Sequence, residues 1–320
     1  MINHLINDGE LEAGGAQGIM HVLCDSIPCS RIFSFNYKQS IDGSKASYGV
    51  FRCYIKYILI FFFRKKQLLV VHHRVFLIPL ILFKRKNFYF ICHNVFPKKN
   101  WIFNYVRDGH FVAVSKTVKD YLEVFSGGYS ISIIENGIKF DKFSKRDVNN
   151  DELYRIAYVG RMSEQKGVDL LIKAFLLMKE VIPKSELVLI GDGESIAQYK
   201  DIAKYEPSII FKGYAEFPFR LCKNSDVMVV PSRYEGFGLV YYEALEYGHS
   251  VIASDLKVFQ KKEGDVSISF FQNENILDLK DKLLLKCVNA DGSNSGKNRH
   301  SIKNQKQMIQ EYLSLFNGNA

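Results

Sequence analysis

Two glutamates, Glu235 and Glu243, stand eight residues apart in the stretch Asp226–Asp255. An apolar run that ends at Pro231 predicts a buried strand before them, and Gly-Phe-Gly followed by an apolar helical pattern predicts a turn and a helix after Glu235. This order aims the free N–H groups of the helix N-terminus beyond the strand end. Backbone donors there suit a phosphate, and a carboxylate one turn deeper suits a sugar hydroxyl. The alternative is a glycine-rich turn that carries two surface glutamates.

Two cations, Arg161 and Lys166, lie five residues apart in a second strand–loop–helix pattern. The predicted strand ends at Val159-Gly160, and the helical pattern begins after Gly167. An arginine fork and a lysine point charge on one such loop can hold a diphosphate. The alternative is a pair of solvated surface cations.

The first half of the chain contains two further candidates. Gly14-Gly15 precedes an apolar helical pattern, and glycines there allow a phosphate to approach the backbone. His93 follows the predicted strand 87–92, and a neutral histidine at a strand end can hydrogen-bond a sugar hydroxyl or shuttle a proton. The pair His72-His73 is a rival, but it precedes a helical pattern, and we expect no strand-end role for it.

These segments resemble a known family. Pro231–Leu245 resembles the Glu-x7-Glu signature of retaining GT-B glycosyltransferases, family 4 (group 1) in particular, and Gly160-Arg161-x4-Lys166-Gly167 resembles the Gly-Arg-x4-Lys-Gly segment of the same family. The resemblance implies an α/β GT-B fold, with two Rossmann-like domains facing across a cleft. It also implies metal-independent, hexosyltransferase-type transfer from a nucleotide sugar to an acceptor hydroxyl with retention of configuration. The sequence contains no Asp-x-Asp motif, in keeping with that expectation.

The resemblance also implies a role for each matching residue. Glu235 would lie by the donor sugar, Glu243 would hold the ribose, and the backbone at Gly213 would hold the nucleobase. Arg161 and Lys166 would neutralise the departing diphosphate. The expected catalytic residues are Glu235 and His93, no metal ligand is expected, and the expected donor-binding residues are Gly15, Arg161, Lys166, Gly213, Gly236, Phe237, Gly238, Leu239 and Glu243.

The same resemblance implies the partners. The donor would be a UDP- or GDP-sugar used as a substrate, with no cofactor. A cytosolic enzyme with a basic acceptor domain further suggests a glycan or lipid-linked glycan acceptor of the bacterial envelope, as in the synthesis of lipopolysaccharide, O-antigen or capsule. Gln260-Lys261 stands where many relatives have an acidic residue, and this departure keeps a noncatalytic GT-B-fold binding subunit open as an alternative function.

Apolar runs alternate with helical patterns along the chain, which predicts parallel sheets covered on both faces. In the first half, strands are expected at about 2–6, 31–35, 67–71, 87–92, 110–114 and 130–134. By resemblance, residues 1–145 form the acceptor-side Rossmann-like domain and residues 146–298 the nucleotide-sugar-binding one. Residues 299–320 would form a helix that returns to the first domain.

Composition narrows the class of protein. A chain of 320 residues with 47% hydrophobic and 24% charged residues is typical of a soluble globular protein of two domains. Six scattered cysteines without a Cys-x-x-Cys pair indicate thiols in a reducing cytosol rather than a disulfide framework or a zinc site. The beginning of the sequence lacks a signal-peptide pattern, and the longest uncharged apolar run, 57–63, is far below the roughly 20 residues that span a bilayer. We therefore expect a cytoplasmic protein.

The positive charge is concentrated in one half. Residues 1–146 contain 21 Lys and Arg against 10 Asp and Glu, whereas the remainder contains 22 against 24. No helix-turn-helix, zinc-finger or RNA-binding signature accompanies this charge, so we expect no nucleic-acid partner. Val50–Lys66 and Val75–Lys86 mix apolar and basic residues, as helices at membrane surfaces do. We expect peripheral binding to an anionic membrane, on the inner face of the plasma membrane; the alternative is charge that serves only solubility.

Overall fold

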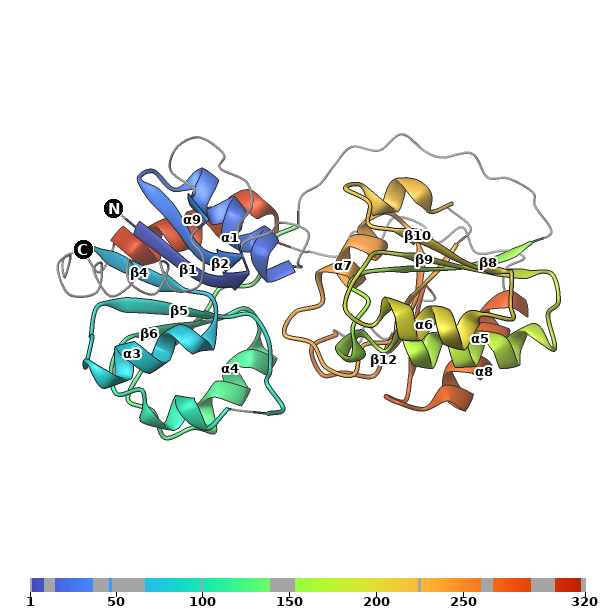
Figure 1. Cartoon of the computed structure of the whole chain (residues 1–320), viewed down its shortest axis with the longest axis horizontal. Coiled ribbons are helices and arrows are strands. Elements are labelled where there is room, and N and C mark those ends of the chain that lie inside the picture. Colours follow the sequence, from blue (N-terminus) through green and yellow to red (C-terminus); the bar gives the residue numbers. More distant parts are fainter. Residues whose placement is uncertain are drawn as a thin grey trace. The chain divides into compact units, whose positions relative to one another are not determined.

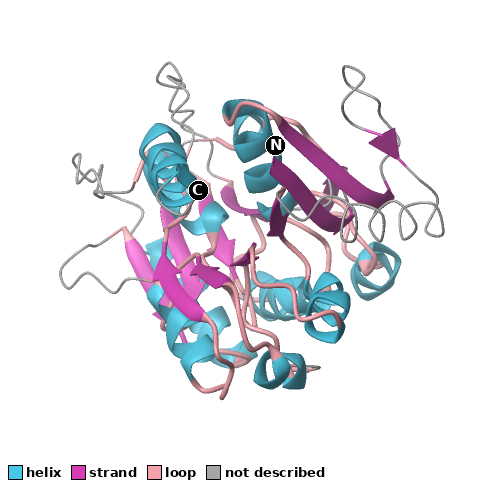
Figure 2. Ribbon diagram, turned by 90° about the vertical axis from the view of Figure 1, so that its left-hand side faces the viewer, coloured by secondary structure: helices cyan, strands magenta, loops and turns pink. Residues whose placement is uncertain are grey.

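The computed structural model describes nine stretches of the chain, namely residues 2–8, 15–36, 46–47, 67–98, 100–138, 153–223, 226–259, 267–288 and 303–317. The chain divides into two compact units. Met1–Gly137 and Lys303–Ala320 form the first unit, and Ile138–Ile302 form the second (Figure 1). Figure 2 shows that helices line the strands of both units.

The first unit contains a parallel sheet, in which the described strands have the order β3-β2-β1-β4-β5-β6-β7. The strands are β1 (Ile2–Asp8), β2 (Ser30–Asn36), β3 (Ala46–Ser47), β4 (Leu68–Val71), β5 (Phe88–Cys92), β6 (His110–Ala113) and β7 (Ser130–Ile133). All of these strands except β3 were expected from the apolar runs. β5 is buried along its whole length, as a strand with both faces covered must be.

Short helices cover this sheet. They are α1 (Gly15–Ser26), η2 (Arg74–Phe76), α3 (Leu77–Leu82), η3 (Trp101–Tyr105), α4 (Lys116–Glu123) and α9 (Gln305–Asn317). α9 comes from the far end of the chain and packs on β5, where the Tyr89 hydroxyl donates to the Leu315 carbonyl at 3.1 Å and the Tyr89 ring contacts Phe316. This contact makes the last helix part of the first unit.

The second unit contains a parallel sheet with the order β10-β9-β8-β11-β12-β13. The strands are β8 (Tyr154–Val159), β9 (Ser185–Ile190), β10 (Ile209–Gly213), β11 (Val227–Val230), β12 (Ser250–Ser254) and β13 (Ile268–Phe271). The helices are η4 (Glu164–Lys166), α5 (Val168–Lys179), α6 (Ile196–Ala203), η5 (Pro218–Leu221), α7 (Leu239–Glu246) and α8 (Ile276–Val288). Side chains of α5, α6 and α8 share one apolar core with the strands.

Strand order identifies the edge at which each sheet can bind a ligand. In open parallel sheets, ligands bind outside the carboxyl ends of the strands, at the point where the strand order reverses. In the second unit that point lies between β8 and β11, whose following loops contain Lys166 and Glu235. In the first unit it lies between β1 and β4, and His72 directly follows β4.

Several segments that the sequence singled out lie outside the described residues. They are Gly14, Val50–Lys66 and Gln260-Lys261. Among the described helices, none is both long and apolar enough to cross a bilayer.

Candidate functional site

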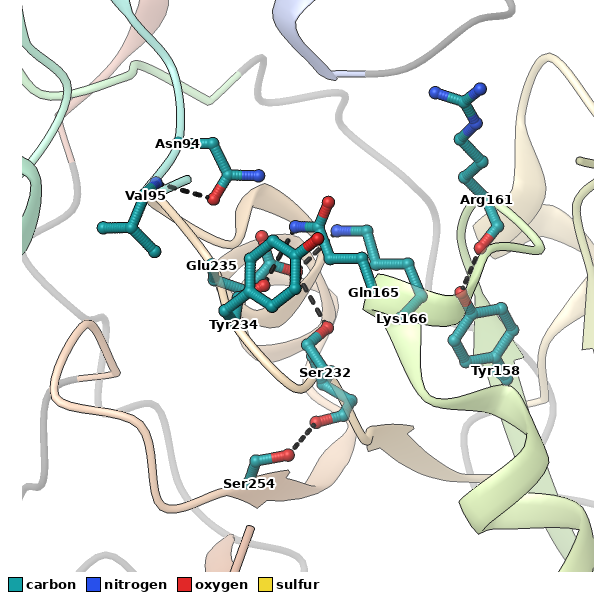
Figure 3. A network of polar contacts seen from close by, with 11 residues as sticks. Asn94, Val95, Tyr158, Arg161, Gln165, Lys166, Ser232, Tyr234, Glu235 and Ser254 are labelled. Carbon is teal, nitrogen blue, oxygen red and sulfur yellow. Dashed lines mark hydrogen bonds and ion pairs between the residues drawn. The ribbon is translucent and has the colours of Figure 1, made fainter. Parts of the chain in front are cut away.

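Lys166 and Glu235 meet at the carboxyl edge of the second sheet, although 69 positions separate them in sequence (Figure 3). Lys166 Nζ lies 2.5 Å from Glu235 Oε1, and the Ser232 hydroxyl donates to the same oxygen at 2.8 Å. The Glu235 side chain is 8% exposed and that of Lys166 25%. The partly open Lys166 therefore presents its ammonium at the sheet edge while Glu235 holds it in place.

The two loops that contribute this pair are fastened to each other. The Arg233 N–H donates to the Gln165 carbonyl at 2.8 Å, and the Gln165 side chain donates to the Tyr234 carbonyl at 2.9 Å. Gly167 has a φ of 63°, and a Cβ there would lie 2.1 Å from the Pro231 carbonyl oxygen. Only glycine allows this approach, which explains why a glycine follows Lys166.

Arg161 does not join the Lys166–Glu235 pair. Its guanidinium pairs with Glu194 at 3.1 Å, both side chains are about half exposed, and Figure 3 shows it pointing away from Lys166. Its backbone is held instead, because the Tyr158 hydroxyl donates to the Arg161 carbonyl at 2.8 Å. Arg161 and Lys166 thus share a loop but their side chains diverge, and the hypothesis that they hold one diphosphate stays a prediction.

The predicted glycine turn leads directly into α7. Gly238 has a φ of 80°, and a Cβ there would lie 2.4 Å from the ring of Phe259. Phe237 is buried against Tyr242, with ring centroids 5.0 Å apart. Within the part of the chain that the structure describes, no side chain caps the N-terminus of α7, which begins at Leu239. The first turn of this helix therefore has backbone donors that suit an anion, and the donor-binding role of Gly236 and Gly238 stays a prediction.

Glu243 lies one turn along α7 and is half-buried. Within the described residues its carboxylate makes no hydrogen bond or ion pair, and desolvation raises its pKa to about 7. A carboxylate that is desolvated without a protein donor is suited to accept hydrogen bonds from ligand hydroxyls.

The two remaining predicted glycines belong to other elements, β10 and α1. Gly213 ends β10 with a φ of 71°, and open space surrounds the position that a Cβ would occupy. Gly15 is exposed at the start of α1 in the first unit. The left-handed backbone at position 213 thus favours glycine. Gly15 instead leaves the backbone exposed at the N-terminus of α1.

His93 follows β5 and ends a row of three hydrogen-bonded histidines. Its Nε2 lies 2.9 Å from Nδ1 of His72, whose Nε2 lies 3.0 Å from Nδ1 of His4. Burial lowers the pKa of His93 to about 4, so the ring is neutral at neutral pH. The expectation that His72 lacks strand-end context is wrong, because His72 directly follows β4. It is His73 that serves the helical turn, by accepting from the Val75 N–H.

Arg233 has a structural role that its sequence context did not reveal. Its guanidinium binds both oxygens of Asp169, at 2.9 and 2.8 Å, and also contacts the Glu164 carbonyl at 2.6 Å and Glu274 Oε1 at 3.1 Å. Burial alone would raise the pKa of Asp169, but hydrogen bonds from Arg233 hold it below its usual value. With Asn273 donating to the Arg233 carbonyl, this residue joins the loops that follow β8, β11 and β13.

Comparisons with known proteins relate this chain to glycosyltransferases. Residues 139–286 match the family model of glycosyl transferases group 1. An uncharacterized glycosyltransferase of Methanocaldococcus jannaschii is 31% identical over 211 residues, which cover 60% of this chain and 51% of that protein. The poly(ribitol-phosphate) alpha-N-acetylglucosaminyltransferase of Staphylococcus aureus is 28% identical over 173 residues, which cover 51% of this chain and 35% of that protein. The chain thus matches about half the length of these relatives, or less.

Solved structures establish the fold class. Anabaena HepE in complex with UDP and glucose superposes with a TM-score of 0.76 at 15% identity, over 99% of both chains. The two parallel sheets with their helices are those of the GT-B fold, and the α/β GT-B prediction is confirmed. At a sequence identity of 15%, this similarity shows the fold alone.

Proposed function

We propose that this protein is a glycosyltransferase that moves a sugar from a nucleotide-sugar donor to an acceptor hydroxyl, with retention of configuration and without a bound metal. The observation that carries the proposal is the convergence of Lys166, Glu235 and the uncapped start of α7 at the strand-order switch of the second sheet. The match of residues 139–286 to group 1 glycosyl transferases supports it.

The arrangement suits a departing diphosphate. Negative charge grows on the phosphates as the bond to the sugar breaks, and fixed donors stabilise that charge without reorganising. Lys166 and the N–H groups at the start of α7 supply such donors from two adjacent loops. Glu235 is engaged on one oxygen by Lys166 and Ser232, and we place the donor sugar beside it.

The arrangement also suits a ribose. Glu243 has a carboxylate with no hydrogen-bond donor from the described residues, one turn deeper on α7 than the phosphate donors. Two vicinal hydroxyls can both donate to one ionised carboxylate, and such charge-assisted bonds offset its desolvation. The donor is accordingly a nucleotide sugar with a UDP or GDP leaving group.

We place the acceptor among glycans and lipid-linked glycans of the bacterial surface, such as lipopolysaccharide, O-antigen or capsule. The Staphylococcus aureus relative acts on poly(ribitol-phosphate), which supports a polymeric, polyhydroxylated acceptor. His93, in the first unit, has a neutral imidazole that is suited to bind a sugar hydroxyl. Peripheral attachment to the inner face of the plasma membrane completes the proposal.

One assay separates this function from that of a noncatalytic binding subunit. The purified protein is incubated with UDP-, GDP- and dTDP-sugars and bacterial lipid-linked glycans, and nucleotide release is measured with and without a chelator. We expect release with one donor and one acceptor class, insensitive to chelation, and a product whose anomeric configuration matches that of the donor. Nucleotide binding without release under any pairing supports the noncatalytic alternative.

A further inference from the structure

Three histidines, one on β1 and two directly after β4 and β5, lie on one face of the first sheet. His4 on β1 is in register with Val70 on β4, and Val70 is in register with Tyr89 on β5. Side chains alternate along a strand, so residues two and four positions later share that face. His72 stands two positions after Val70, and His93 four positions after Tyr89. The three rings therefore form a diagonal row that runs from the middle of β1 to the carboxyl edge at β5.

The rings of this row are connected by hydrogen bonds. His4 Nδ1 lies 3.0 Å from His72 Nε2, and His72 Nδ1 lies 2.9 Å from His93 Nε2. Neighbouring ring planes are tilted by 28° and 14°, with centroids 5.3 and 5.2 Å apart. Nearly coplanar rings at this separation meet edge to edge, which is the geometry of N–H···N bonds.

Burial keeps the row neutral. It lowers the pKa of His4 to about 3 and that of His93 to about 4. It also holds the pKa of His72 well below its usual range, an effect to which the two flanking histidines add. A neutral imidazole has one N–H donor and one acceptor nitrogen. Because His72 uses both of its nitrogens, the two bonds must point in the same direction along the row.

Only two arrangements of hydrogen satisfy this condition. Either every ring carries its hydrogen on Nδ1, or every ring carries it on Nε2. They differ at the two ends, His4 Nε2 and His93 Nδ1, which are buried and have no hydrogen-bond partner in the described part of the chain. An orphaned buried N–H is rarer in folded proteins than an under-satisfied acceptor. His4 lies within the sheet, in register with Ile32, away from the edge where ligands bind. We therefore assign the unprotonated, accepting nitrogen to His4 Nε2.

We propose that His4 and His72 are positioning residues that fix the tautomer of His93, so that His93 presents Nδ1–H as a hydrogen-bond donor at the carboxyl edge of the first sheet. The ligand atom is an oxygen, and assigning it to a sugar hydroxyl rests on the proposed function. In this arrangement His93 binds and orients a ligand and does not act as a base, because its only other nitrogen is already engaged by His72.

The test is 15N NMR of the full chain labelled at histidine, without substrate at neutral pH. Protonated and unprotonated ring nitrogens have well-separated shifts, and N–H···N bonds give couplings between nitrogens. We expect hydrogen on Nδ1 of all three rings and two couplings, His4 to His72 and His72 to His93. Hydrogen on Nε2 of His93 overturns the assigned direction, and a charged ring or missing couplings overturn the row itself.

Two variants extend the test. His72→Phe removes the ring that engages His93 Nε2, so we expect His93 to become a mixture of tautomers and kcat/KM to fall by about 2- to 13-fold, as for one neutral hydrogen bond. His110→Gln is the control, because His110 binds Ser130 and Ser132 elsewhere on the same sheet. An unchanged His93 spectrum in His72→Phe refutes the positioning role. The wild-type spectrum decides the tautomer whether or not His72→Phe folds, and whether or not transfer activity is found.

Discussion

Of the two cations proposed to bind the diphosphate, Lys166 is paired with Glu235, whereas Arg161 is half exposed and paired with Glu194. We expect Lys166→Ala to weaken binding of the free nucleoside diphosphate by roughly ten- to hundredfold, since a hydrogen bond to a charged group contributes about 1.5–3 kcal/mol. Arg161→Ala should cost less, because its guanidinium is exposed and already paired with Glu194. Isothermal titration calorimetry measures both affinities.

A charge-matched control accompanies these variants. Lys204→Ala removes a cation of the same unit that lies at the end of α6 and pairs with Asp201. It should leave nucleotide affinity unchanged. Equal affinity in Lys166→Ala and Lys204→Ala would remove Lys166 from the binding site.

Substitutions of Glu235 and Glu243 should affect different kinetic constants. A ribose contact is present in the ground state and the transition state alike, so Glu243→Ala should raise the donor KM more than it lowers kcat. Glu235→Ala should lower kcat more, since it removes the residue that holds Lys166 beside the departing group. Steady-state kinetics with varied donor distinguish the two, and identical profiles contradict the division of roles.

The raised pKa of Glu243 predicts that the free energy of unfolding depends on pH. Its folded pKa is raised to about 7 from an ordinary value of 4.5, so the folded state favours the protonated form. The stability linked to this proton is fully present below pH 4.5 and is lost as the pH rises through about 7. Glu243→Gln should therefore raise the Tm of the second unit by a few degrees at pH 8 and have little effect near pH 4. Calorimetric scans at both pH values measure the difference, and a stabilisation that does not depend on pH rules out this cause.

At the scale of elements, Arg233 determines how three loops meet. Its planar fork binds both oxygens of Asp169, a geometry that a lysine ammonium cannot reproduce. We expect Arg233→Lys to speed amide hydrogen exchange in residues 161–167 and 231–238, and to lower nucleotide affinity about tenfold, the cost of one charge-assisted contact. Hydrogen-exchange mass spectrometry follows the loops, and calorimetry the affinity.

The control for this variant is Arg155→Lys. Arg155 lies near the amino end of β8, where it pairs with Glu186 and lies near Asp226, and its side chain is 11% exposed. It should cost similar stability without altering the loops at the carboxyl edge. If both variants speed exchange in those loops equally, Arg233 has no special role there.

At the scale of the whole molecule, the first unit presents apolar side chains next to basic ones. Leu82 is 70% exposed, Phe83 49% and Trp101 59%, on or beside α3 and η3, and the chain continues into Lys84 and Lys86. We expect the protein to sediment with anionic but not zwitterionic vesicles, and to be released by salt, because lysines near an anionic leaflet contribute about 1 kcal/mol each.

Two substitutions test whether this surface is the one that binds. Leu82→Ser with Trp101→Ser should reduce the bound fraction. Leu285→Ser, which changes an exposed leucine of α8 in the second unit, should not. Equal sedimentation with both lipid types shows that these charges serve only solubility.

Local patterns in the sequence were sufficient to predict the fold class and to select part of the candidate site. Strand and helix periods depend on neighbouring residues, so six strands of the first unit could be placed from apolar runs. Gly167 and Gly238 could be recognised from the sequence because a left-handed backbone or a close approach of neighbouring atoms requires glycine at that one position. Lys166, Glu235 and Glu243 were recognisable because their spacing resembles a known signature.

Other features depended on the tertiary structure, because they join residues far apart in sequence. Arg233 reaches Asp169 across 64 positions, and the bond from His4 to His72 spans 68, so only sheet register brings these groups together. Arg161 had the expected type and spacing, but Glu194, a residue of another loop, decides where its guanidinium points. His93 was found by its place at a strand end, yet its neutrality follows from burial, which spacing along the chain does not encode.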